Sequence, residues 1–178
     1  MDNSLKHTLL VEISREMSQR DLRLSKMFLQ KMVFLLQALY SFPTAYEFKL
    51  YTYGPYSIEL INDLDYLFAT DLLVIDYIQE GEYIGSSITP GIKHSKVISC
   101  DEESIAKYRE KISLVIDLFG NYTEKELELR AALVFLLNKS QDLPITRLVE
   151  KVQEKKPYFT KEEIKDAYND LIDMDILN

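Results

Sequence analysis

The segment MFLQKMVFLLQALY at residues 27–40 constrains the fold most, because it would be apolar on nearly every side of a helix. Its main polar residues are Gln30, Lys31 and Gln37. A helix that is apolar all round must be covered by other elements of the protein. The pattern therefore predicts a helix over about 26–40 that lies at the centre of the fold and is its most buried element.

Other periodic segments surround this helix in the first half of the chain. They predict a helix over 5–19, a strand over 46–52, a helix over 57–68, and a hairpin with strands near 72–78 and 83–89. Helix, helix, short strand, helix and hairpin is the order of a winged-helix domain. The hairpin would be the wing, and helix 57–68 would take the recognition-helix position. This fold serves DNA readers and protein binders alike, so it does not decide the function.

The second half of the chain is predicted to be helical. Asp101 opens a helix that runs to Phe119, and two capping boxes mark later helix starts (Thr123 with Glu126, and Thr160 with Glu163). We therefore predict a mainly α (α+β) fold. A winged-helix-like lobe with a small β-sheet, residues 1–90, packs against a helical lobe, residues 91–178, and the seam lies in the polar stretch 90–100.

The stretch FKLYTYGPYS, residues 48–57, has two interpretations. In the structural one, Tyr46, Phe48 and Leu50 form the inner face of the strand, Gly54 and Pro55 make the turn, and Ser57 caps the next helix. In this interpretation the tyrosines Tyr51, Tyr53 and Tyr56 only cover the turn.

In the second interpretation, these tyrosines form a contact surface for another protein beside the basic corner Arg20, Arg23 and Lys26. Tyr and Arg are frequent hot-spot residues of interfaces. From Lys6 to Lys31 the chain has six basic and three acidic residues, a local excess of +3. An ordinary solvated helix face explains the same charges. This interpretation places the tyrosines beside the basic corner only if strand 46–52 pairs with the wing.

Composition excludes several classes of function. The net charge of −8, from 21 basic and 29 acidic residues, opposes non-specific nucleic-acid binding, which depends on neutralising phosphates. The single Cys100 allows no internal disulfide or multi-cysteine zinc site. No apolar run reaches the length of a membrane span, and the N-terminus lacks a secretory pattern, so we expect a cytoplasmic protein.

No catalytic or metal-binding motif is recognisable. His7 and His94 have no neighbouring nucleophile or ligand motif, and Asp63 and Asp65 would point away from each other on a helix. We therefore expect no enzyme activity, no cofactor and no metal, and an enzyme ranks third among the functions.

Three segments carry a resemblance to known families. LQKMVFLLQ (29–37), EFKLYTYGPYSIEL (47–60) and KKPYFTKEEIKDAYNDL (155–171) resemble the YwgA-like family of uncharacterised bacterial proteins. More distantly, the central helix and the strand ending in Tyr-Gly-Pro resemble the Panacea domain of SocA-like antitoxins. That resemblance implies an antitoxin that neutralises a toxin protein. The matching positions are Gln30, Lys31, Tyr53, Gly54 and Pro55.

The leading hypothesis is a non-enzymatic protein-binding module, either an antitoxin-like neutraliser or a regulatory adaptor, and its partner could be a toxin. The alternative is a winged-helix DNA-binding transcriptional regulator. Glu59, Asp63 and Asp65 on the recognition-position helix, and Glu80 and Glu82 at the wing tip, would repel phosphate. The sequence leaves open whether the protein forms a homodimer.

Overall fold

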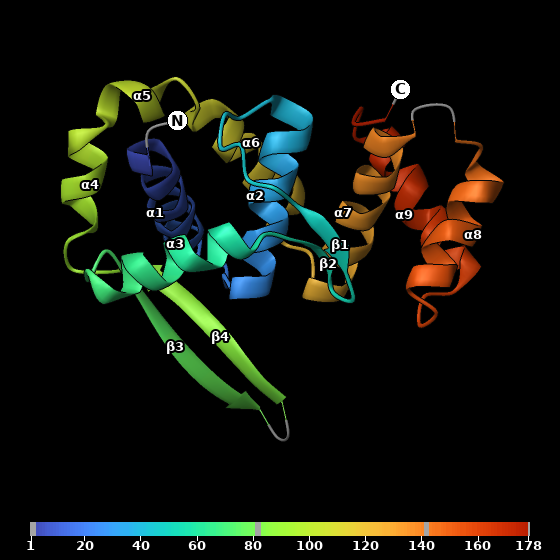
Figure 1. Cartoon of the computed structure of the whole chain (residues 1–178), viewed down its shortest axis with the longest axis horizontal. Helices are drawn as coiled ribbons and strands as arrows, with labels where there is room; N and C mark the ends of the chain where they lie inside the picture. Colours follow the sequence, from blue (N-terminus) through green and yellow to red (C-terminus); the bar gives the residue numbers. More distant parts are fainter. Residues whose placement is uncertain (1–2, 81–82, 141–142, 178) are drawn as a thin grey trace.

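The computed structural model describes residues 3–80, 83–140 and 143–177 (Figure 1). Helices dominate it, and its strands form two separate antiparallel two-stranded sheets, which confirms the mainly α (α+β) class. The elements are α1 (Asn3–Gln19), α2 (Lys26–Tyr40), β1 (Lys49–Tyr51), β2 (Gly54–Tyr56), α3 (Ile58–Ala69), β3 (Leu73–Glu80), β4 (Tyr83–Pro90), α4 (His94–Cys100), α5 (Glu102–Ala106), α6 (Arg109–Phe119), α7 (Glu124–Lys139), α8 (Ile145–Lys155) and α9 (Lys161–Asp173).

Helix α2 has the predicted bounds, and the Ser25 hydroxyl caps it by accepting from the Phe28 N–H at 3.0 Å. Residues 28–36 of α2 are all buried, and the helix packs against α6 and α7. In α7 the buried run is one residue longer, over 127–136. The prediction that α2 is the most buried element was therefore wrong, and the two helices form the centre together.

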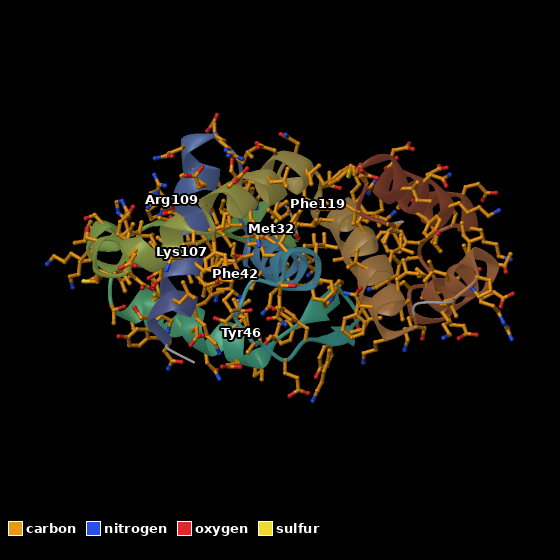
Figure 2. All side chains as sticks on the ribbon, turned by 90° about the horizontal axis from the view of Figure 1, so that it is seen from above. Met32, Phe42, Tyr46, Lys107, Arg109 and Phe119 are labelled. Atoms are coloured by element: carbon orange, nitrogen blue, oxygen red, sulfur yellow. The ribbon has the colours of Figure 1, made fainter. Side chains whose placement is uncertain are left out.

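The core extends across both halves of the chain. Met32 of α2 and Phe119 of α6 are fully buried within it, and Phe42, which follows α2, is 1% exposed (Figure 2). Side chains from residues 1–90 and 91–178 belong to one hydrophobic cluster. The division into lobes at residue 90 stays a prediction.

The stretch predicted as a polar seam contains a helix. Residues 94–100 form α4, which packs against α1. The prediction of a single helix from Asp101 to Phe119 was also wrong, since the helical structure is interrupted between α5 and α6. The break brings Arg109 Nε within 2.8 Å of Glu12 Oε1 on α1. Both predicted capping boxes are present at the starts of α7 and α9.

The β3–β4 hairpin confirms the predicted two-stranded hairpin, and its role as a wing stays a prediction. Its register runs from Leu73 opposite Pro90 to Glu80 opposite Tyr83, and it projects away from the helices in Figure 1. Glu82, which was predicted at the wing tip, lies outside the described residues. The winged-helix assignment itself stays a prediction.

The strand predicted over 46–52 is much shorter and has a different partner. Lys49–Tyr51 pairs with Gly54–Tyr56, so β1 and β2 form a hairpin of their own, which is not joined to the wing in the described chain. The prediction that this strand pairs with the wing was wrong. Gln37 gives a physical reason, because its side-chain amide bonds the N–H and the carbonyl of Tyr46 at 3.0 and 3.1 Å. These backbone groups are then not free for a longer strand.

Candidate functional site

A pocket of about 470 Å³ lies where the β1–β2 hairpin meets α2 and α7. The tyrosine that follows α8 completes its wall. We call it the hairpin pocket, and it is lined by Met27, Lys31, Tyr53, Glu124, Lys125, Glu128 and Tyr158. Its volume is within the range of small-ligand sites, about 300–1,000 Å³.

The tight hairpin depends on Gly54. Thr52 and Tyr53 form the turn, and Gly54 and Pro55 belong to β2, so the prediction that Gly54 and Pro55 make the turn was wrong. Gly54 has φ +97°, a conformation that side chains disfavour. A Cβ there would lie 3.1 Å from Lys31 Cε and 3.3 Å from Glu128 Cγ. The glycine therefore brings the hairpin close to two pocket residues.

Gln30 fixes the other end of the hairpin. Its amide nitrogen donates to the Ser57 carbonyl, and its amide oxygen accepts from the Ser57 N–H, both at 2.9 Å. Gln30 is fully buried, so it serves as a clamp between α2 and the start of α3. Ser57 stands at the N-cap of α3, but its side chain forms no capping bond, so that predicted role was wrong.

A buried ion pair supports the pocket from the C-terminal helices. Lys156 is 1% exposed, and its Nζ lies 2.5 Å from Glu128 Oε1 and 2.6 Å from the Thr52 carbonyl. The Tyr158 hydroxyl lies within hydrogen-bond distance of Glu128 Oε1 and of the Thr52 carbonyl. Burial, followed by the bond to Glu128, raises the pKa of Tyr158. Residues far apart in sequence thus hold the hairpin tip in place.

Lys31 differs from Lys156 because no direct partner neutralises it. It is 2% exposed, and its ammonium forms no hydrogen bond or ion pair within residues 3–80, 83–140 and 143–177. Burial lowers the pKa of Lys31 to about 8, although the charges of Glu128 and Glu124 oppose this shift. The pocket therefore contains a buried ammonium that is still mostly protonated at neutral pH.

The predicted tyrosines border a second cavity beside the hairpin pocket. We call it the tyrosine hollow; it measures about 270 Å³ and is lined by Met27, Tyr51, Thr52, Tyr53, Gly54 and Tyr56. Tyr51 and Tyr53 expose 57% and 63% of their surface, and the Tyr51 ring packs edge-on against Tyr56 at 5.7 Å. Met27 and Tyr53 line both cavities.

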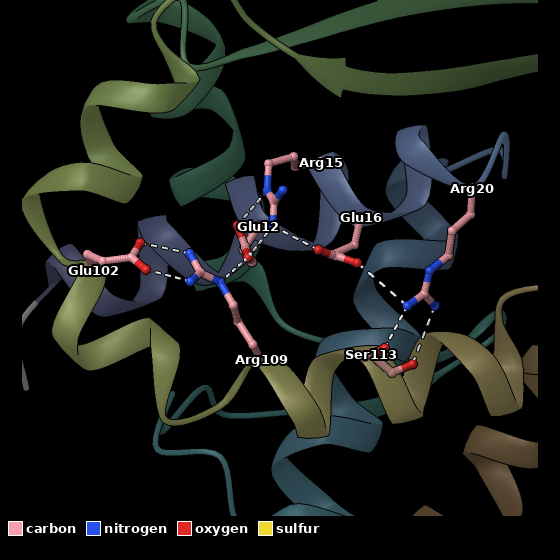
Figure 3. A network of polar contacts seen from close by, with 7 residues as sticks. All are labelled: Glu12, Arg15, Glu16, Arg20, Glu102, Arg109 and Ser113. Carbon is pink, nitrogen blue, oxygen red and sulfur yellow. Dashed lines mark hydrogen bonds and ion pairs between the residues drawn. The ribbon is translucent and has the colours of Figure 1, made fainter.

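The predicted basic corner does not form a single site with these tyrosines. Arg20 is held against α6 by Ser113 Oγ at 2.6 Å and Asp117 at 2.9 Å (Figure 3 shows the Ser113 contact). Lys26 Nζ lies 3.2 Å from the Tyr77 hydroxyl on β3. Arg23 lines a third cavity, of about 400 Å³, which shares Glu124 and Lys125 with the hairpin pocket.

Sequence reasoning did not identify most of the pocket lining, namely Met27, Glu124, Lys125, Glu128 and Tyr158, nor Lys156, which pairs with Glu128. All of these except Met27 come from the second half of the chain, which was interpreted only as helical. One signal was available for Glu128, because an acidic residue within the largely apolar helix LELRAALVFLLN must be paired if it is buried.

The described residues contain no cluster of three or more His, Cys, Asp or Glu side chains suited to a metal, and none of their helices is long and apolar enough to cross a membrane. Comparison with models of known protein families and with curated proteins found no match. The YwgA-like and Panacea resemblances therefore stay predictions.

Proposed function

We propose that the protein is a cytoplasmic, non-enzymatic protein-binding module, an antitoxin-like neutraliser or regulatory adaptor, whose contact surface is centred on the β1–β2 hairpin. One observation carries this proposal. Tyr51 and Tyr53 are more than half exposed and stand beside the hairpin pocket and the tyrosine hollow. Exposed aromatic side chains next to cavities are typical hot spots of protein interfaces.

The anchoring of the hairpin supports the proposal energetically. Lys156 bonds the Thr52 carbonyl on one side of Tyr53, and Gln30 clamps Ser57 on the other side of the hairpin. A surface that is ordered before binding loses less conformational entropy when the complex forms. Tyrosine side chains on an anchored hairpin give a large contact area at a low cost in conformational entropy.

The DNA-binding alternative gains no comparable support. Helix α3 carries Glu59, Asp63 and Asp65 and has no Lys or Arg. Lys6 forms an ion pair with Glu59, so this neighbouring cation is already engaged. We keep protein binding as the proposed function.

A photo-crosslinking amino acid at position 53 tests the proposal. The matched control carries the same group at Tyr77, which is 69% exposed on β3. The partner should crosslink at position 53 and not at position 77 in cells that produce the protein. With the purified partner, Tyr53→Ala should weaken binding by about tenfold or more, since hot-spot tyrosines contribute at least that much.

Crosslinking from position 77 alone would show that the interface lies on the β3–β4 hairpin and would contradict the proposal. A Tyr53→Ala variant that binds the purified partner as tightly as the wild type would do so too. Crosslinks between two copies of the chain at position 53 would identify the partner as the protein itself.

A further inference from the structure

The charges around the hairpin pocket are satisfied at every described position except Lys31. Lys156 pairs with Glu128 at 2.5 Å, and Lys125 pairs with Glu163 at 3.2 Å. Glu124 accepts a hydrogen bond from Ser25. Lys31 is 2% exposed, and its ammonium is left with Coulomb attraction to Glu128 and Glu124 and with no hydrogen bond or ion pair to any residue that the structure describes.

An unpaired buried ammonium is costly for a fold, and proteins normally pair such a group or remove it. Here the charge lies in a pocket that is open to solvent at the exposed ring of Tyr53. A bound anion would give the Lys31 ammonium the direct hydrogen-bonded partner that it lacks among the described residues. This is the feature of the structure that points to a ligand.

We propose that the hairpin pocket binds a small monocarboxylate, whose carboxylate accepts a hydrogen bond from Lys31 Nζ and whose apolar body lies against Met27 and the Tyr53 ring. The inference goes beyond the proposed function and does not depend on it, because such a ligand binds to the isolated chain.

The surrounding charges favour a single negative charge. Glu124 and Glu128 line the same pocket as Lys31, so a phosphate dianion would meet two carboxylates and only one unpaired cation. Met27 and the tyrosine rings offer surface for an apolar or aromatic body. Lys31 is 2% exposed, whereas Tyr53 at the rim of the pocket is 63% exposed. A ligand must therefore pass the rim to reach Lys31, and a free small molecule does so more easily than a side chain attached to a partner protein.

Calorimetry and ligand-observed NMR with the purified full chain test this site. The probes are benzoate, phenylacetate and hexanoate, each compared with its primary amide, and inorganic phosphate as the alternative anion. At least one carboxylate should bind about tenfold more tightly than its amide, because a charge-assisted hydrogen bond contributes at least that much. Carboxylates that bind no better than their amides, no saturable binding at all, or a preference for phosphate would overturn the proposal.

Two variants assign the binding to Lys31. Lys31→Met keeps a long unbranched side chain without the charge, and it should lose the preference for carboxylate over amide. Lys165→Met is the matched control, because it removes the same charge from an exposed position on α9 that does not line the pocket. It should keep the wild-type affinity within about twofold, since salt screens the attraction between a distant exposed charge and the ligand. Equal losses in the two variants would show diffuse attraction rather than a site at Lys31.

The pH dependence provides a second readout. The charged or titratable groups around Lys31 are Glu124, Lys125 and Glu128 on α7, Lys156 and Tyr158 after α8, and Tyr53 on the hairpin. Since the pKa of Lys31 is about 8, carboxylate affinity should weaken as the pH rises beyond that value, and Lys31→Met should remove this dependence. An affinity that increases above pH 8 would mean that neutral Lys31 is the binding form and would overturn the proposal.

Discussion

At Gly54 the backbone has φ +97°, and a Cβ would come within 3.1 Å of Lys31 Cε and 3.3 Å of Glu128 Cγ. Both features oppose any side chain at this position. Gly54→Ala should therefore lower the free energy of unfolding by about 1–3 kcal/mol, the usual cost of a strained backbone conformation. Urea unfolding of the two proteins measures this difference.

Tyr53→Ala is the control for Gly54→Ala. It changes the same hairpin at an exposed side chain, and its effect on stability should stay within about 0.5 kcal/mol. A Gly54→Ala protein as stable as the wild type would show that the hairpin can relax away from Lys31 and Glu128.

Lys31 should lower the free energy of unfolding of the protein, as expected of a residue that serves binding rather than folding. Its pKa falls from 10.5 to about 8 on folding, a difference of about 3 kcal/mol between the two protonation states. The native state therefore disfavours the proton. Below pH 8 both states are protonated and the full penalty is present. Lys31→Met should raise the free energy of unfolding at pH 7 by an amount on the order of 1–3 kcal/mol.

The sign of the pH dependence follows from the same shift. Between about pH 8 and 10.5 the unfolded chain binds more protons at Lys31 than the native state does, so this residue makes stability rise with pH. The difference in stability between Lys31→Met and the wild type should shrink over this range in urea titrations. A constant difference would mean that Lys31 titrates normally in the folded protein.

At the scale of elements, a buried carboxylate joins α1 to α5 and α6 (Figure 3). Glu12 is fully buried, and it accepts hydrogen bonds from Arg15 at 2.7 and 2.9 Å and from Arg109 at 2.8 Å. Arg109 also bonds both carboxylate oxygens of Glu102. Burial opposes ionisation of Glu12, but the arginines outweigh it and hold its pKa below 4.5.

Glu12→Leu should destabilise the protein by about 1–3 kcal/mol, because it removes the charge-assisted hydrogen bonds of a buried carboxylate while Arg15 and Arg109 keep Glu16 and Glu102 as partners. Because the pKa of Glu12 is lowered in the fold, its contribution is complete above pH 4.5 and is lost as the pH falls through the folded-state pKa. Urea unfolding near neutral pH and at acidic pH should therefore show a smaller effect of the substitution in acid.

Glu16→Gln is the matched control on the same helix. Glu16 also pairs with Arg15, at 2.8 Å, but its side chain is 21% exposed. Its loss should cost less than about 1 kcal/mol, as for most solvent-accessible ion pairs. Equal effects at positions 12 and 16 would contradict the importance of burial at Glu12.

At the scale of the whole molecule, charge determines the expected response to nucleic acid. The net charge is −8, and α3 carries only acidic charges. We predict no binding to random duplex DNA at micromolar concentration in about 150 mM salt, because too few cations are available to displace counterions. Fluorescence anisotropy checks this. Micromolar binding that weakens steeply with added salt would favour the DNA-binding alternative.

Much of the helical architecture was predictable because it depends on residues close together in the sequence. The apolar run of α2, its Ser25 cap, the capping boxes before α7 and α9, and the alternation in β3 and β4 each act over a few positions. Exposure of Tyr51 and Tyr53 was also predicted, since alternation places them on the outer face of a strand.

The sequence by itself therefore determined the class of the fold and most of its helices, while tertiary structure decided the site. Lys156 lies 104 positions from Thr52, and no local pattern indicates that its ammonium holds that carbonyl. Gln37 limits β1 by bonding Tyr46, and Gly54 brings the hairpin against Lys31 and Glu128. Local propensities act within a turn of helix or strand, whereas the pairing of buried charges depends on which distant elements pack together.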